Sequence, residues 1–218
     1  MAITVETLAV RKRFGDEWTD VRDFVRPRDF MVRQVVSARA DWTPQQMWQW
    51  VVETIRYPVG TPRTLDLYVM TSRPFPIPIL GWLVPSHRYI TRDFWEFPAE
   101  VLRDREADCE GSAALLVSML RCRWPDFPAY VSVGYFREFG HVWVSVQSGT
   151  DWQIWDTTLG FVPSPPPLER TSPDYQVLFR FDDRQVIQVA EELVVPERTW
   201  EPGKDNALRS WYVVVGRS

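Results

Sequence analysis

Three residues far apart in the sequence carry the side chains of a nucleophilic acyl-transfer site: Cys109, His141 and Asp156. A thiolate can attack a carbonyl carbon, and an imidazole can take up and return the proton. A carboxylate can fix the imidazole tautomer and stabilise its charged form. This chemistry requires the three groups to meet in space. The elements around them must therefore be able to bring them together.

The residues around Cys109 predict a helix that begins at the cysteine. Asp108 is a natural N-cap, and the apolar residues that follow have the spacing of one buried helical stripe: Ala113, Leu116, Val117 and Leu120. The helix N-terminus favours a thiolate by roughly 0.3 to 2 kcal/mol, whereas the carboxylates of Asp108 and Glu110 disfavour it. A nearby imidazolium would decide this balance. Without one, Cys109 is an ordinary small core residue.

His141 and Asp156 fall on two neighbouring predicted strands, residues 140–146 and 152–158. Side chains alternate between the two faces of a strand, so His141 shares a face with Trp143. If the strands form a hairpin, the length of its loop decides whether the imidazole and the carboxylate meet.

Three loop lengths give three different pairings of this hairpin. A two-residue loop at 148–149 pairs His141 directly with Asp156, at a Cβ distance of about 4.5 to 5.5 Å. A four-residue loop at 148–151 places Asp156 opposite Trp143, diagonal to the histidine but on its face. A three-residue loop places the two on opposite faces. Two of the three registers therefore keep the imidazole and the carboxylate together.

Further elements are predicted along the chain. Thr43 and Pro44 begin a helix that ends at 57–58, with a buried stripe of Met47, Trp50, Val51 and Ile55. Pro98 begins a short helix before the cysteine. Strands are expected at 3–13, 130–136, 175–181, 185–189 and 210–215. Residues 59–92, rich in Pro and Gly, read as an irregular excursion in which His87 is a surface-loop histidine, and residues 162–173 read as an extended connector.

Composition limits the class of protein. The 218 residues are 45% hydrophobic with a net charge of −4, which fits one large core and no basic surface for nucleic acid. The two cysteines lie on one predicted helix about 20 Å apart, too far for a disulfide, so both thiols are expected to be free. No signal-peptide pattern and no span of about 20 apolar residues appears, so we expect a cytoplasmic protein without membrane contact. No cofactor, zinc or calcium site is expected.

Four stretches together resemble the transglutaminase-like superfamily of cysteine enzymes, in particular its bacterial cysteine-proteinase branch. Residues 47–57 resemble its helix ending in Ile-x-Tyr. Residues 94–102 with 108–110 are similar to its Trp-x-x-Pro-x-Glu and Gly-Asp-Cys-Glu-Asp patterns. Residues 140–144 resemble its His-x-Trp-Val pattern, and residues 155–158 resemble its Trp-x-Asp-x-Thr pattern. The resemblance covers roughly residues 41–161.

The resemblance implies an α+β fold with a papain/transglutaminase-like core, in which the helix bearing the nucleophile packs on an antiparallel sheet. It implies that Cys109 is the nucleophile, His141 the general base and acid, and Asp156 the orienting carboxylate. The sequence departs from the family pattern at two positions, with Ala107 in place of Gly and Gly111 in place of a second Asp.

Two tryptophans close to these residues are candidates for substrate binding or for an indole N–H donor to an oxyanion. Trp95 precedes the cysteine helix, and Trp143 lies two residues after His141 on the same strand. Tryptophans in such places are more often core anchors than reagents.

The predicted organisation is an N-terminal scaffold segment (1–40), a catalytic core (41–161) and a C-terminal β extension (162–218) packed on the core. The predicted function is thiol-dependent acyl transfer on a peptide, protein or other amide substrate, ending in hydrolysis. Two alternatives are a non-catalytic interaction module on the same scaffold and a transamidase that cross-links proteins. The superfamily includes peptidases, amidases, protein cross-linkers and inactive members, so the resemblance in fold does not choose the substrate.

Overall fold

The computed structural model describes residues 3–5, 9–11, 18–57, 68–71, 75–76, 83–84, 88–91, 95–137 and 139–189. His87 and the strand expected at 210–215 lie outside these residues, as does most of the excursion expected at 59–92. Four short strands are described there, paired β4 with β7 and β5 with β6: β4 (Tyr68–Thr71), β5 (Phe75–Pro76), β6 (Leu83–Val84) and β7 (Arg88–Thr91).

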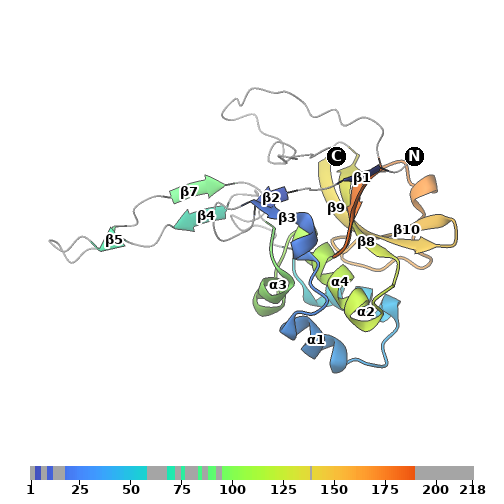
Figure 1. Ribbon diagram of the computed structural model, residues 1–218, viewed down its shortest axis with the longest axis horizontal. Helices are drawn as coiled ribbons and strands as arrows, with labels where there is room; N and C mark the ends of the chain where they lie inside the picture. The colour runs from blue at the N-terminus through green and yellow to red at the C-terminus, as the bar shows by residue number, and fades with distance from the viewer. Residues whose placement is uncertain are drawn as a thin grey trace.

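An antiparallel sheet of six strands, in the order β1-β12-β11-β8-β9-β10, forms one layer of the fold (Figure 1). Its strands are β1 (Ile3–Val5), β8 (Ala129–Phe136), β9 (Phe139–Ser148), β10 (Asp151–Trp155), β11 (Tyr175–Phe181) and β12 (Val186–Gln188). β11 pairs with β8 in the middle of the sheet. The described part of the C-terminal extension therefore continues the central sheet.

Helices gather on one side of this sheet (Figure 1). They are α1 (Phe30–Ser37), α2 (Pro44–Thr54), α3 (Pro98–Asp104) and α4 (Cys109–Arg123), with two short 3-10 helices, η1 (Val21–Phe24) and η3 (Glu169–Thr171). The expected strand at 3–13 is divided between β1 and β2 (Ala9–Arg11), and β2 pairs with β3 (Trp18–Asp20). The α+β arrangement implied by the transglutaminase-like resemblance is confirmed: the helix that begins at Cys109 packs on the antiparallel sheet.

α2 begins as predicted and ends earlier. The Thr43 hydroxyl accepts from the Gln46 N–H at 3.2 Å, and the Gln46 side chain accepts from the Thr43 N–H at 2.8 Å, which completes a capping box. The helix stops at Thr54 instead of 57–58. Its buried face carries Trp48 in place of the expected Trp50. Trp48 is drawn inward because its ring stacks on a tryptophan of β10.

α4 is buried on all its faces between Glu110 and Arg121. The expectation of a single buried stripe was therefore wrong. The reason is that α1, α2 and α3 pack on α4 from one side while β8 and β9 pack on it from the other. A polar side chain on such a helix has to find its partners inside the protein.

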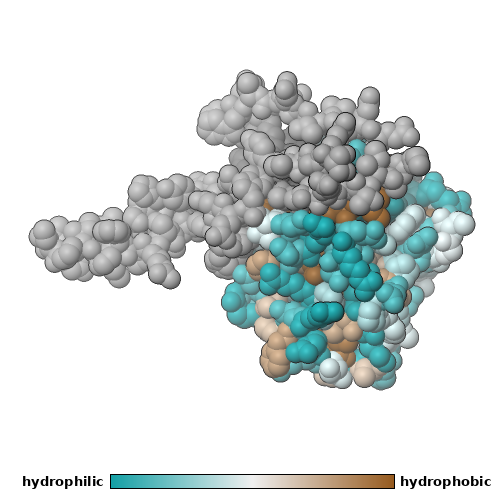
Figure 2. Space-filling view, viewed as in Figure 1, coloured by the Kyte–Doolittle hydropathy of each residue, from teal (hydrophilic) through white to brown (hydrophobic). Residues whose placement is uncertain are grey.

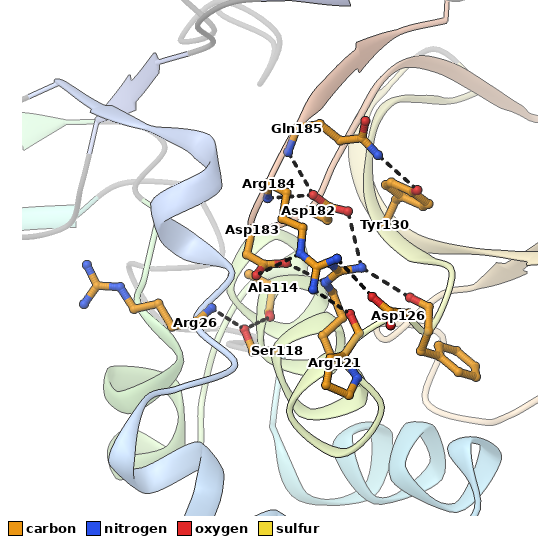
Figure 3. Close-up of polar contacts among 12 residues, drawn as sticks. Arg26, Ala114, Ser118, Arg121, Asp126, Tyr130, Asp182, Asp183, Arg184 and Gln185 are labelled. Carbon is orange, nitrogen blue, oxygen red and sulfur yellow. Dashed lines mark hydrogen bonds and ion pairs between the residues drawn. The ribbon is translucent and has the colours of Figure 1, made fainter.

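Two polar tethers hold the second half of α4 (Figure 3). The Ser118 hydroxyl accepts from the Arg26 backbone N–H at 2.8 Å and donates to the Ala114 carbonyl at 2.7 Å. Arg121 forms ion pairs with Asp182 at 3.3 Å and Asp183 at 2.5 Å, in the turn between β11 and β12. The helix is thus fixed both to the N-terminal segment and to the sheet.

The face of the molecule shown in Figure 2 is mostly hydrophilic where it is described, with smaller hydrophobic areas low over the helical layer. Among the described residues, no helix combines the length and the apolar character that crossing a bilayer would demand. The described hydrophobic side chains are instead mostly gathered between α4, its neighbouring helices and the sheet.

Replacing Arg121 tests the tether between α4 and the sheet. Arg121→Met leaves the buried carboxylate of Asp182 without its cation, so we expect a loss of about 3 kcal/mol in the free energy of unfolding. Guanidinium chloride unfolding measures this loss. Arg184→Met is the matched control, because Arg184 is 56% exposed and pairs with Asp126 at the surface, and it should leave stability unchanged. Equal losses in the two variants would contradict the assignment.

Candidate active site

The Cys109 thiol lies at the N-terminus of α4, as predicted. Asp108 is the N-cap, and its Oδ1 accepts from the Gly111 N–H at 3.3 Å. The loop before it is held by Arg56, whose N–H donates to the Arg105 carbonyl at 3.0 Å and whose carbonyl accepts from the Ala107 N–H at 3.1 Å. Backbone contacts to the end of α2 therefore fix the approach to the thiol.

The two departures from the family pattern, Ala107 and Gly111, belong together in space. A Cβ atom added at Gly111 would lie 3.0 Å from the Ala107 Cβ, 3.1 Å from the Val101 Cγ2 and 3.2 Å from the Glu96 Oε2. Glu96 is fully buried. The methyl group at 107 and the Glu96 carboxylate thus occupy the space that a side chain at 111 would need.

The strands β9 and β10 pair in the register that was expected for a loop at 148–151, which keeps His141 and Asp156 on one face. Ser148 pairs with Asp151 across a two-residue turn at 149–150, and Gly149 has the positive φ of 63° that the first central residue of a type II′ turn requires. Asp156 therefore follows the strand at the position opposite Trp143. The directly opposed pairing of His141 with Asp156 was wrong, because the turn lies one residue later than expected.

His141 and Asp156 nevertheless meet. The His141 Nε2 and the Asp156 Oδ2 are 2.7 Å apart, and the carboxylate belongs to a residue that is only 1% exposed. Asp156 Oδ2 also accepts from the Tyr175 hydroxyl at 2.9 Å. Asp156 Oδ1 accepts from the Thr158 N–H and from the Thr158 hydroxyl, both at 2.8 Å. The buried carboxylate thus accepts four hydrogen bonds.

The electrostatics couple His141 to both of its partners. Burial by itself lowers the pKa of His141, but hydrogen bonds to Asp156 and Cys109 and the charges of both groups outweigh it and raise the pKa to about 10. Because Asp156 faces Nε2, Nδ1 is the ring nitrogen available to the sulfur. Burial tends to raise the pKa of Asp156, yet the bond and charge of His141 and the two Thr158 donors hold that pKa below its usual value.

A second carboxylate lies beside the thiol. The Cys109 Sγ donates to the Glu110 Oε2 at 3.1 Å, and Glu110 is buried. A neutral thiol is satisfied by this contact, whereas a thiolate would face the negative charge of the carboxylate. The sequence predicts that the Glu110 carboxylate disfavours a Cys109 thiolate and that an imidazolium favours it. The position of Glu110 beside the sulfur agrees with the first of these two effects.

Contacts around Asp156 link it to α4 and α2. The Ser112 hydroxyl on α4 donates to the Asp108 carbonyl at 2.7 Å and lies 2.7 Å from the Thr157 hydroxyl. The Trp48 indole N–H donates to the Asp156 carbonyl at 3.0 Å, and its ring stacks on Trp155 at 4.9 Å. The thiol-bearing helix and the carboxylate are thus connected through Ser112 and Thr157.

Sequence reasoning missed several of these contact residues. Thr158 could have been found, because a carboxylate followed two residues later by an N–H donor is a common turn motif. Tyr175 and Ser112 carry no local signal for their contacts with Asp156 and Thr157. Only the packing of β11 and α4 brings them there.

The structure places both candidate tryptophans in the interior. Trp143 is 0% exposed, stacks beside the His141 ring at 6.0 Å and meets Tyr175 edge-on at 5.1 Å. Trp95 is 2% exposed and packs between Phe24 and Phe181. Among the described residues, the Trp143 Nε1 is a buried donor with no hydrogen-bond partner. A role of Trp95 or Trp143 in substrate binding stays a prediction. Within the described ranges, no three His, Cys, Asp or Glu side chains are grouped to hold a metal ion.

No protein-family model and no curated protein matches this chain. Among solved structures, EGTA-treated LapG of Legionella pneumophila is 13% identical with a TM-score of 0.41, covering 73% of this chain and 84% of LapG. The calcium-bound form is 14% identical with a TM-score of 0.39, covering 72% and 87%. A candidate cysteine protease from Cytophaga hutchinsonii is 15% identical with a TM-score of 0.40, covering 67% and 42%. At TM-scores below 0.5, these likenesses say nothing about the activity of this chain.

Replacing Asp156 tests the cause of the histidine's high pKa. In Asp156→Asn the anionic partner is gone while burial remains, so we expect the pKa of His141 to fall from about 10 toward its ordinary value of 6.5. Two-dimensional 1H–15N NMR resolves the titration, because the chain contains only two histidines. Asp151→Asn, the same change at the start of β10, should leave the pKa unchanged. An unaltered titration in Asp156→Asn would contradict the coupling.

Proposed function

We propose that this chain is a transglutaminase-like cysteine hydrolase that cleaves a peptide or other amide bond through an acyl-thioester on Cys109. One observation carries the proposal. The His141 Nε2 donates a hydrogen bond to the buried Asp156 carboxylate at 2.7 Å, and the His141 side chain also interacts with the Cys109 thiol. A sulfur, an imidazole and a carboxylate in this order are the groups that thiol-dependent acyl transfer requires.

The first half of the proposed reaction forms the acyl-enzyme. The proton of the Cys109 thiol passes to His141, and the thiolate attacks the carbonyl carbon of the amide. A C–S bond forms, and the carbonyl oxygen becomes an oxyanion. When the oxyanion collapses, the C–N bond breaks and the His141 imidazolium gives its proton to the departing amine. An acyl-thioester and a free amine result.

The second half regenerates the thiolate. A water molecule gives a proton to His141 as its oxygen attacks the thioester carbonyl carbon. The C–S bond then breaks, the carboxylic acid leaves, and the thiolate and imidazolium are restored. No oxidant, reductant or metal enters the atom balance of either half.

The surroundings of the three groups fit these steps. Asp156 hydrogen-bonds the imidazole at Nε2, which leaves Nδ1 as the ring nitrogen that can exchange a proton with the sulfur. The Cys109 N–H lies in the first turn of α4, where backbone N–H groups lack an intrahelical acceptor and can bind an oxyanion. The Glu110 carboxylate accepts a hydrogen bond from the uncharged thiol and thus stabilises the state before proton transfer.

A library of synthetic decapeptides incubated with the protein tests the reaction. We expect cleavage products detectable by mass spectrometry, lost to background in Cys109→Ala because no acyl-thioester can form. Cys122→Ala is the matched control and should retain activity. Hydroxylamine added to the mixture should intercept the acyl group as a hydroxamate. Amine adducts without any hydrolysis would favour the transamidase alternative, and no products at all would favour the interaction module.

Selective alkylation supplies a test that needs no substrate. Burial raises the pKa of the Cys122 thiol, whereas the Cys109 side chain interacts with that of His141, which can take up its proton. Iodoacetamide reacts with the thiolate, so it should label Cys109 roughly tenfold faster than Cys122. His141→Ala should abolish the preference. Equal, slow labelling of both thiols in the unmodified protein would contradict a catalytic Cys109.

A further inference from the structure

Tyr175 reaches the candidate site from outside the stretch that resembles the superfamily. It is the first residue of β11, 19 residues after Asp156. Its hydroxyl donates to the Asp156 Oδ2 at 2.9 Å, the same oxygen that meets the His141 Nε2 at 2.7 Å. Two donors therefore share one carboxylate oxygen.

The Tyr175 ring is held firmly in this position. Its centroid lies 4.7 Å from that of Phe136, 5.1 Å from that of Trp143 and 6.3 Å from that of His141. Its backbone pairs with Phe136 across the sheet. The hydroxyl is thus aimed at the carboxylate by ring packing and by strand pairing together.

We infer that Tyr175 is a positioning residue for the proposed hydrolysis: its hydroxyl fixes the Asp156 carboxylate and limits how tightly that carboxylate holds the His141 imidazolium. This inference rests on the proposed function. The physical reason is the shared oxygen. A hydrogen bond from Tyr175 withdraws negative charge from Oδ2, so less of it is available to His141. The imidazolium then releases its proton to the departing amine more readily.

The hydroxyl stays a donor over the working range of pH. Burial and the charge of Asp156 raise the pKa of Tyr175 above its ordinary value, with a smaller contribution from Asp174. Asp174 is itself paired with Arg137 at 3.3 Å, and Glu110 faces the sulfur. Asp108, the buried N-cap of α4, is a further carboxylate beside the thiol. Removing the Tyr175 hydroxyl changes none of them directly.

Tyr175→Phe isolates the hydroxyl, because the ring and its packing against Phe136 and Trp143 are retained. The measurement is the 1H–15N NMR titration of His141 in a His87→Asn background, which leaves a single imidazole to follow. Tyr130→Phe is the matched control. Tyr130 lies on β8 in the same sheet, and its hydroxyl accepts from the Gln185 side chain at 3.2 Å instead of contacting Asp156.

We expect the pKa of His141 to rise by about half a unit in Tyr175→Phe, roughly threefold in the protonation equilibrium, and to stay unchanged in Tyr130→Phe. A mere packing defect would have the opposite sign, because water admitted to the His141–Asp156 bond would weaken it and lower the pKa. An unchanged or lowered value in Tyr175→Phe would overturn the positioning role. If Cys109 meanwhile keeps its selective alkylation, the proposed function survives that result. A failure of the proposed function would instead appear as equal labelling of Cys109 and Cys122 in the unmodified protein.

Discussion

A buried negative charge is the constraint around which this fold is arranged. The Asp156 carboxylate lies almost completely out of water, where an unpaired charge is very costly. It is tolerated because four hydrogen bonds reach it from His141 on β9, Tyr175 on β11 and Thr158 in its own turn. Each of these donors comes from an element whose position must be right. The electrostatic requirement thus ties the register of the hairpin to the placement of a strand much later in the chain.

The thiol is tied to the same carboxylate by a helix that has no solvent-facing side over most of its length. α4 is buried between the helical layer and the sheet, so each polar side chain along it contacts a different part of the fold. Ser112 meets Thr157 next to the carboxylate, Ser118 binds the backbone of Arg26, and Arg121 pairs with the turn after β11. These contacts fix the helix along its axis. The distance between the sulfur and the imidazole is therefore set by the whole core.

Local signals in the sequence were enough to predict the capping residues, the first residue of α4 and the strands of the hairpin. Asp108 and Thr43 carry their own chemistry as N-caps, and alternating valines mark β9. The exact register was beyond such signals, because two-residue turns at 148–149 and at 149–150 are both plausible around one glycine. The burial of every face of α4 was also beyond them, since a helix pattern does not reveal how many layers surround it.

Tyr175 shows a second limit of sequence reasoning. It lies in a segment that carried no recognisable chemistry, and its role arises only because β11 is inserted beside β8 in the sheet. Asp156 and Tyr175 lie on opposite sides of the predicted boundary at residue 161, yet one hydrogen bond joins them. Long-range strand order, which short motifs do not encode, decides which side chains surround the carboxylate.

The coupling between sulfur and imidazole is the central claim, and the response of His141 to a blocked thiol tests it most directly. In a Cys122→Ala background, methyl methanethiosulfonate converts only Cys109 into a neutral methyl disulfide, and the NMR titration of His141 is recorded before and after. Loss of the hydrogen bond and charge of the sulfur should lower the pKa of His141 from its value of about 10. A titration that is the same before and after blocking would contradict the account.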